Sequence, residues 1–178
     1  MIFLQRITTE DASARYLSWI NDPKTTEFLE IRFKKYNLAD LKLFLENTIK
    51  TQQNGDLEPL FTIRLQATGE HIGNIKLGPI NTHHSTADIG LLIGQREWWG
   101  KGIATEAIRL ICDYAFKERN LQKLKAGCYA SNMNSARAFE RNGFKIEGQL
   151  RSQVSTVSGE RTNLILLGLC REEWGEKK

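Results

Sequence analysis

The chain has 178 residues, of which 40% are hydrophobic and 26% charged, and its formal net charge is +4. These values predict one soluble globular domain over residues 1–178, because the chain is too short to build two comfortable cores. No apolar run approaches the ~20 residues that a membrane span needs. The lysines and arginines are dispersed rather than gathered in a basic stripe, so we expect neither a membrane nor a nucleic acid as a partner.

The cysteines and the N-terminus indicate the compartment. Cys112, Cys128 and Cys170 are far apart and odd in number, which argues against a disulfide framework and against a zinc knuckle. The first residues lack the basic segment and the long apolar segment of a signal peptide. We therefore expect a cytoplasmic protein without a metal site.

Hydrophobic periodicity and turn signals predict a mixed order of helices and strands. The expected elements are strand 2–7, helix 10–21, helix 38–50, strands 60–66, 71–78 and 86–93, helix 103–118, strand 122–129, helix 133–141, and strands 144–152 and 161–170. Asn37 and Asp40 have nearly the spacing of a capping box at the start of the second helix. The order defines a mixed α/β domain in which strand 86–93, helix 103–118 and strand 122–129 form a right-handed parallel crossover.

Residues 98–106 read Trp-Trp-Gly-Lys-Gly-Ile-Ala-Thr-Glu, at the junction between a predicted strand and a predicted helix. Glycines allow backbone angles that other residues avoid, and a helix begins with free N–H groups at the positive end of its dipole. This combination is typical of a cradle for a phosphate or diphosphate. An ordinary tight turn between a strand and a helix explains the stretch equally well.

Two standard nucleotide-binding motifs do not fit this turn. A Walker loop requires Ser or Thr after its lysine and an earlier glycine, whereas Gly102 follows Lys101. The dinucleotide fingerprint requires a third glycine where Thr105 stands. A short diphosphate cradle after a strand remains.

At this point the chain resembles the GCN5-related N-acetyltransferases, the GNAT superfamily. The signature Arg/Gln-x-x-Gly-x-Gly/Ala of that family falls on residues 99–104, where Gly102 and Ala104 match and Trp99 stands at the first position, in place of the usual arginine or glutamine. A second block, residues 132–144, is similar to the segment of the family that runs from an asparagine through a helix to Gly-Phe. The longer string resembles the branch of ribosomal-protein N-terminal and amino-sugar acetyltransferases.

This resemblance implies a mixed central sheet of about seven strands, splayed between the fourth and fifth, with about four helices. It implies that acetyl-CoA lies in the splayed gap and that backbone N–H groups from Trp99 to Ala104 hold its diphosphate. The residues expected to bind this acyl donor are Leu92, Ile93, Trp99, Gly100, Lys101, Gly102, Ile103, Ala104, Thr105, Asn132, Ser135 and Phe139.

The reaction implied is the attack of a neutral amine on a thioester, which requires a proton acceptor and a donor for the developing oxyanion. Asp88 is the best-placed carboxylate on strand 86–93 for a base; a surface carboxylate is the alternative. By family analogy, the oxyanion donor is a backbone N–H near Leu92 or Ile93. Phe139 occupies the place where many relatives have a tyrosine acid, so Ser135 is the substitute hydroxyl, or else a residue that caps the helix.

The acceptor is less well defined. The segment between the first two helices usually walls the substrate side in this fold, and there Arg32 suits a phosphate or carboxylate and Glu30 an ammonium. We consider three alternatives: an acetyltransferase of an amino sugar, free or linked to a nucleotide; an acetyltransferase of a protein N-terminus; and a non-catalytic acyl-CoA sensor. A monomer and a homodimer both remain open, because the apolar strand end Leu164-Ile165-Leu166-Leu167 suits either a dimer contact or a core strand.

Two further candidates have simpler explanations. His83 and His84 are adjacent, so on a strand they would point in opposite directions, and a polar loop is the better interpretation. Cys128 alternates with apolar residues and is read as a core residue rather than as a nucleophile.

Overall fold

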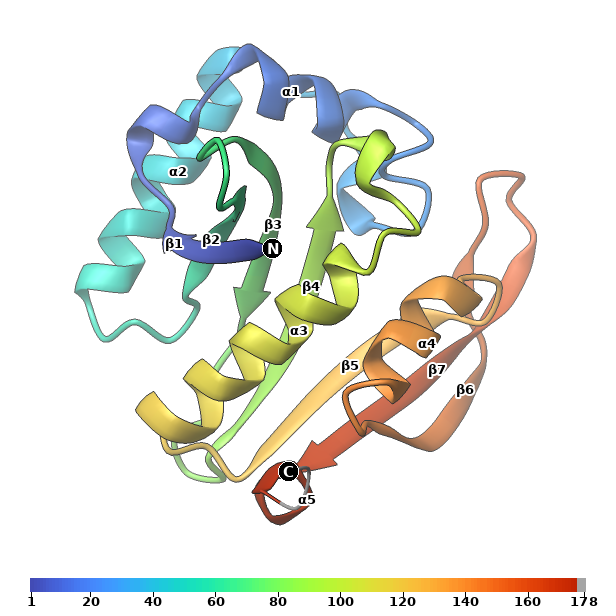
Figure 1. The fold of residues 1–178 in the computed structure, drawn as a ribbon. Helices are drawn as coiled ribbons and strands as arrows, with labels where there is room; N and C mark the ends of the chain where they lie inside the picture. The colour runs from blue at the N-terminus through green and yellow to red at the C-terminus, as the bar shows by residue number, and fades with distance from the viewer. Residues whose placement is uncertain (176–178) are drawn as a thin grey trace.

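The computed structural model describes residues 1–175 and contains one mixed seven-stranded sheet with the strand order β1-β2-β3-β4-β5-β7-β6 (Figure 1). All neighbouring strands are antiparallel except β4 and β5, which are parallel. The strands are β1 (Ile2–Arg6), β2 (Leu60–Leu65), β3 (His71–Leu77), β4 (Thr86–Ile93), β5 (Lys123–Tyr129), β6 (Lys145–Ser155) and β7 (Arg161–Cys170). The mixed sheet with its parallel crossover confirms the fold class expected from the sequence.

The helices cover the sheet through two separate apolar clusters. One cluster buries the inner faces of α3 and α4, and the other buries those of α1 and α2. The helices are α1 (Ala14–Asn21), α2 (Leu38–Gln53), α3 (Ile103–Asp113), α4 (Met133–Glu140) and α5 (Arg171–Gly175), with 3₁₀ turns η1 (Thr9–Asp11), η2 (Glu30–Phe33) and η3 (Arg96–Trp98) and a π turn η4 (Tyr114–Glu118). None of the helices in residues 1–175 is long and apolar enough to cross a bilayer.

Local hydrogen bonds correct the boundary of the first predicted helix. The expected helix 10–21 is divided, because the Ser13 hydroxyl accepts from the N–H of Tyr16 and starts a new helix there. The Asp11 carboxylate accepts from the Thr8 N–H at 2.8 Å and so caps the 3₁₀ turn η1, which precedes α1. The capping box of Asn37 and Asp40 is confirmed, with both reciprocal bonds at 2.9 Å.

Strands β4 and β5 separate soon after they begin to pair. Their register covers only Thr86–Asp88 against Lys123–Lys125, and the strands then diverge toward their carboxyl ends. Figure 1 shows the gap between them, with the N-terminus of α3 above β4 and α4 beside β5. This divergence confirms the splay expected between the fourth and fifth strands.

The pairing of the C-terminal strands shows the role of the apolar run from Leu164 to Leu167. β7 pairs with β5 along one edge and with β6 along the other, and Leu167 and Leu169 are fully buried. Both edges of β7 are therefore occupied within the chain. The apolar run from Leu164 to Leu167 is a core strand, and the outer strand is β6.

Candidate active site

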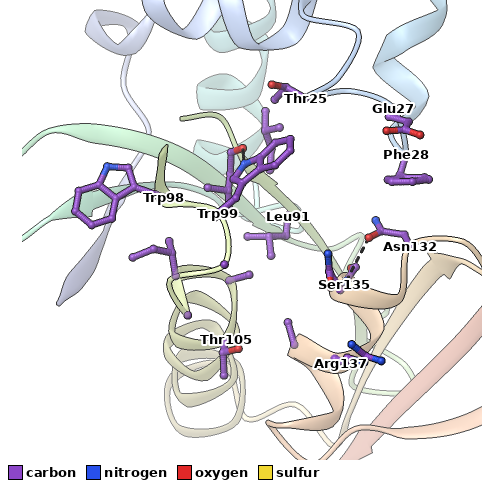
Figure 2. Close-up of a pocket in the computed structure, with 18 of the residues that line it drawn as sticks. Thr25, Glu27, Phe28, Leu91, Trp98, Trp99, Thr105, Asn132, Ser135 and Arg137 are labelled. Carbon is purple, nitrogen blue, oxygen red and sulfur yellow. Dashed lines mark hydrogen bonds between the residues drawn. The ribbon is translucent and has the colours of Figure 1, made fainter. Parts of the chain in front are cut away.

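A cavity of about 480 Å³ lies where β4 leaves β5 (Figure 2). Its walls come from the end of β4, the turn into α3, the start of α4 and the segment that follows α1. The lining residues expected from the sequence are Leu92, Ile93, Trp99, Gly100, Gly102, Ile103, Ala104, Thr105, Asn132 and Ser135. The structure thus brings the two distant sequence blocks, residues 98–106 and 132–144, to one cavity.

The turn into α3 has the geometry of an anion cradle. Gly100 and Gly102 have φ values of 73° and 80°, which residues other than glycine rarely adopt. A Cβ added at either glycine would meet nothing within 4 Å, so the space in front of the backbone is open. This open, left-handed turn before a helix N-terminus fits a diphosphate.

The available N–H groups in this turn are fewer than expected. The N–H of Trp99 donates to the Arg96 carbonyl at 3.0 Å, and the N–H of Lys101 donates to the Trp98 carbonyl at 3.4 Å. In contrast, the N–H groups of Gly100 and of residues 102–105 have no hydrogen-bond acceptor within residues 1–175. The cradle is therefore centred on residues 102–104.

The pairing register of β4 identifies which of its N–H groups face the gap. In the antiparallel ladder, Gly78 N–H donates to the Asp88 carbonyl and Gly94 N–H donates to the Ile72 carbonyl. Since hydrogen-bonding direction alternates along a strand, Leu92 bonds toward β3, whereas Leu91 and Ile93 face the gap. Leu91 also lines the cavity, and the sequence analysis missed it because the direction depends on register.

The start of α4 places two polar side chains at the cavity. Asn132 caps the helix, its side-chain oxygen accepting from the Ser135 N–H at 3.3 Å. The Ser135 hydroxyl lies 3.3 Å from the sulfur of Cys128. Burial raises the pKa of the Cys128 thiol, so at neutral pH it is a protonated core residue, as the sequence pattern indicated, rather than a thiolate nucleophile.

Two arginines missed by the sequence analysis line the same cavity. Arg137 and Arg141 are four residues apart in sequence, the first on α4 and the second immediately after it, and neither has an ion-pair partner within residues 1–175. Buried Asn142 donates from its amide to the carbonyls of Thr105 and Ala138, both at 2.9 Å, which ties the end of α4 to the start of α3. The sequence signal that could have identified Arg137 and Arg141 is their spacing of four residues, which places two cations on one helix face.

Several expected site residues lie elsewhere. Asp88 sits where β4 and β5 still pair, and its carboxylate forms an ion pair with Lys125 at 3.0 Å, outside the cavity. Phe139 is buried in the core against Phe144, with ring centroids 5.0 Å apart. Lys101 lies over the ring of Trp98 and does not line the cavity. None of the three is among the residues that line the cavity.

Glu30 and Arg32 also do not line the cavity. The Tyr129 hydroxyl donates to Glu30 Oε1 at 2.8 Å and accepts from Arg32 at 2.9 Å. Instead, Thr25, Glu27 and Phe28 of the preceding segment form the wall opposite Asn132 (Figure 2). Glu27 is the one carboxylate among the lining residues within the described chain.

The paired histidines are distant from this site. His83 and His84 are exposed in the turn between β3 and β4, at the closed end of the parallel pair. The His84 N–H donates to the side chain of Asn81 at 3.0 Å. This placement confirms the interpretation of a polar loop.

Comparison with known proteins identifies the family. A family model described as "Acetyltransferase (GNAT) domain" matches residues 2–145. The chain is 27% identical over 172 residues, 96% of its length and 93% of the relative's, to "Uncharacterized N-acetyltransferase p20" of Bacillus licheniformis. It is 36% identical over 110 residues, 61% of its length and 59% of the relative's, to "Putative ribosomal N-acetyltransferase YdaF" of Bacillus subtilis.

Two further similarities concern polyamine enzymes. A spermidine N(1)-acetyltransferase of Escherichia coli is 30% identical over 110 residues, which is 62% of this chain and 58% of that protein. The crystal structure of a spermidine N-acetyltransferase from Vibrio cholerae, in complex with CoA and spermine, superposes with a TM-score of 0.83 at 20% identity and covers 98% of both chains. At that identity the structural match shows the shared fold.

The chain therefore belongs to the GNAT family of acetyltransferases. It is an acetyl-CoA-dependent N-acetyltransferase, and it transfers an acyl group to an amine. The resemblance seen in the two sequence blocks is confirmed.

Proposed function

We propose that this enzyme acetylates the primary amine of a small molecule, with a nucleotide-linked amino sugar as its preferred acceptor. The observation that carries the donor half of the proposal is the cavity between the free N–H groups of residues 102–104 and the gap-facing edge of β4. Acetyl-CoA supplies the activated acetyl group there. The three free cysteines are consistent with a reducing cytoplasm.

In this proposal, Gly102, Ile103 and Ala104 bind the diphosphate through their N–H groups, and Arg137 and Arg141 supply positive charge from the opposite wall. The gap-facing edge of β4, at Leu91, pairs with the amides of the pantetheine arm as an added strand would. The extended backbone of Leu91, whose N–H and C=O face the gap, supports this role, while the Ile93 carbonyl is already bonded to the Trp99 indole.

The chemistry is assigned to three groups around the gap. The Ile93 N–H stabilises the negative charge that develops on the thioester oxygen. The Ser135 hydroxyl hydrogen-bonds to the departing sulfur. Glu27 replaces Asp88 as the proposed proton acceptor, through water, because it is the carboxylate that lines the cavity while Asp88 is paired with Lys125.

Charge on the acceptor side supports an acceptor that is not a polycation. The charged residues that line the cavity are three cations (Lys24, Arg137 and Arg141) and one carboxylate (Glu27). A polyamine would meet net repulsion from this lining, whereas the diphosphate of a nucleotide sugar would be attracted. Glu27 remains available for the single ammonium group that must react.

A protein N-terminus is the second candidate. It is favoured by the 36% identity to a relative named as a putative ribosomal N-acetyltransferase. The two acceptors differ in what they require beyond the amine, since a peptide needs an extended groove and a sugar a closed pocket.

The test is release of free CoA from acetyl-CoA in the presence of a UDP-linked amino sugar, glucosamine, spermidine and peptides with N-terminal Ala or Ser. We expect the nucleotide-linked amino sugar to give the highest kcat/KM and Glu27→Gln to lower kcat for it. A higher kcat/KM for the peptides or for spermidine would overturn the preferred acceptor. Tight binding of acetyl-CoA with no turnover of any amine would favour a sensor.

A further inference from the structure

Tyr129 is the centre of a hydrogen-bonded cluster on the acceptor side of the sheet. It ends β5, is 6% exposed, and its hydroxyl contacts both Glu30 and Arg32. Arg32 also donates to the Leu29 carbonyl at 3.2 Å and to the Ser155 carbonyl at 2.6 Å. One guanidinium therefore joins the 3₁₀ turn η2, the end of β5 and the end of β6.

The cluster is directly behind the cavity wall. The ring of Phe28, which lines the cavity, lies against the ring of Tyr129 with a centroid distance of 5.7 Å. Leu29, whose carbonyl accepts from Arg32, also lines the cavity. Figure 2 shows Phe28 and Glu27 facing Asn132 from the segment that these bonds hold.

The hydroxyl of Tyr129 has both of its roles occupied. Burial raises the pKa of Tyr129, so its hydroxyl stays protonated and donates to the Glu30 carboxylate at neutral pH. Arg32 supplies the matching donor, so the buried oxygen is fully satisfied. Removing Glu30 or Arg32 leaves the buried Tyr129 hydroxyl without one of its hydrogen bonds, which costs more free energy than the bond itself contributes.

We infer that Glu30, Arg32 and Tyr129 are positioning residues that hold the acceptor wall formed by Glu27, Phe28 and Leu29 against the splayed gap. This inference rests on the proposed function, because it assigns that wall to the amine. It differs from the expectation that Glu30 and Arg32 themselves bind the acceptor. In the positioning role, what matters at residue 30 is a hydrogen-bond acceptor for Tyr129, and its negative charge is dispensable.

The experiment compares Tyr129→Phe, Glu30→Ala and Glu30→Gln, with Tyr114→Phe as a matched tyrosine whose hydroxyl accepts from Arg6 at 3.0 Å outside the cavity. Acetyl-CoA binding is measured first by calorimetry. Steady-state kinetics then use the panel amine with the highest kcat/KM. Amide hydrogen exchange of residues 24–33 supplies a readout that needs no acceptor.

We expect Tyr129→Phe and Glu30→Ala to raise the acceptor KM about tenfold, the effect of one partly buried hydrogen bond to a carboxylate. The KM for acetyl-CoA should stay unchanged, and exchange should accelerate in residues 24–33. Glu30→Gln should restore the acceptor KM, because its amide oxygen still accepts from Tyr129. Tyr114→Phe should leave both KM values unchanged.

Two results would overturn the positioning role. If Glu30→Gln is as impaired as Glu30→Ala, the charge binds the acceptor directly. If Tyr129→Phe keeps wild-type exchange and a wild-type acceptor KM, the cluster does not hold the wall. Absence of acetyl-CoA binding in the wild type would instead contradict the proposed function, so the two failures are distinguishable.

Discussion

The indole Nε1 of Trp99 donates to the main-chain carbonyl of Ile93 over 2.8 Å. This bond joins the turn before α3 to the last residue of β4, the two parts that the acyl donor must contact together. It satisfies the Ile93 carbonyl and leaves the Ile93 N–H for the ligand. The tryptophan that departs from the family signature therefore has a structural role on the gap-facing edge of β4.

Replacing Trp99 with phenylalanine should loosen this connection. Trp99→Phe keeps an aromatic ring but removes the donor, so we expect about 1 kcal/mol lower free energy of unfolding and a roughly fivefold higher Kd for acetyl-CoA. Trp98→Phe is the control, because no acceptor for the Trp98 indole lies within residues 1–175. Equal Kd values for Trp99→Phe and wild type in calorimetry would show that the bond is irrelevant to the donor.

Arg137 and Arg141 should bind the phosphates of the donor. Each change to glutamine removes a charge-assisted hydrogen bond, so we expect the Kd for CoA to rise about tenfold at low salt. The difference from wild type should shrink at 1 M salt, where the Debye length is about 3 Å. Arg151→Gln, on exposed β6, is the control. A Kd that does not change with either substitution contradicts this assignment.

Ser135 should act in the chemical step. Ser135→Ala removes the hydroxyl that lies beside Cys128, and we expect kcat to fall about 10- to 100-fold with the KM for acetyl-CoA unchanged. Exposed Ser131 provides the matched control, Ser131→Ala. If Ser135→Ala raises only the KM for acetyl-CoA, its hydroxyl serves in binding rather than in catalysis.

His71 should make stability depend on pH. Burial lowers the pKa of His71, which packs edge-on against the rings of Tyr16 and Trp19. In the unfolded chain His71 takes up its proton near pH 6.5, so below that pH the unfolded state binds more protons and the folded state loses stability. Urea unfolding at pH 7.5, 6.5 and 5.5 measures this loss.

The contribution of His71 is the difference between wild type and His71→Gln in the pH dependence of the unfolding free energy. We expect the variant to lose less stability than wild type as the pH falls from 7.5 to 5.5. His84→Gln, in the exposed turn, should retain the wild-type slope. Identical slopes for wild type and His71→Gln would show that another group is responsible.

The parts of the site that depend on local sequence were predictable, and those that depend on distant contacts were not. The glycine turn follows from Gly100 and Gly102, and strand 86–93 follows from its alternating pattern. The position of Asp88 depends on where β4 leaves β5, which no local pattern encodes. Arg32 bonds to Ser155, 123 residues away, so its role could not be read from its own neighbours.

The helix boundaries show the same division. The capping box at Asn37 is local and was predicted. The extent of burial is not local: Phe44 is 49% exposed, because α2 turns only Leu41 and Leu45 fully into the core. Periodicity identifies the apolar face of a helix, but the width of the buried stripe is set by the neighbouring elements.

Calorimetric titration of CoA into Gly102→Asp tests the central claim most directly. A Cβ at Gly102 meets nothing within 4 Å, and the left-handed φ of 80° costs an aspartate only about 1–2 kcal/mol, so the protein should fold, while the added carboxylate repels the diphosphate. Gly159→Asp is the matched control, since Gly159 has φ 87° and equally open space in the turn between β6 and β7. We predict that Gly159→Asp binds CoA like wild type and that Gly102→Asp binds at least 100-fold more weakly, roughly 2.7 kcal/mol. Wild-type affinity in folded Gly102→Asp would contradict the diphosphate cradle at residues 102–104.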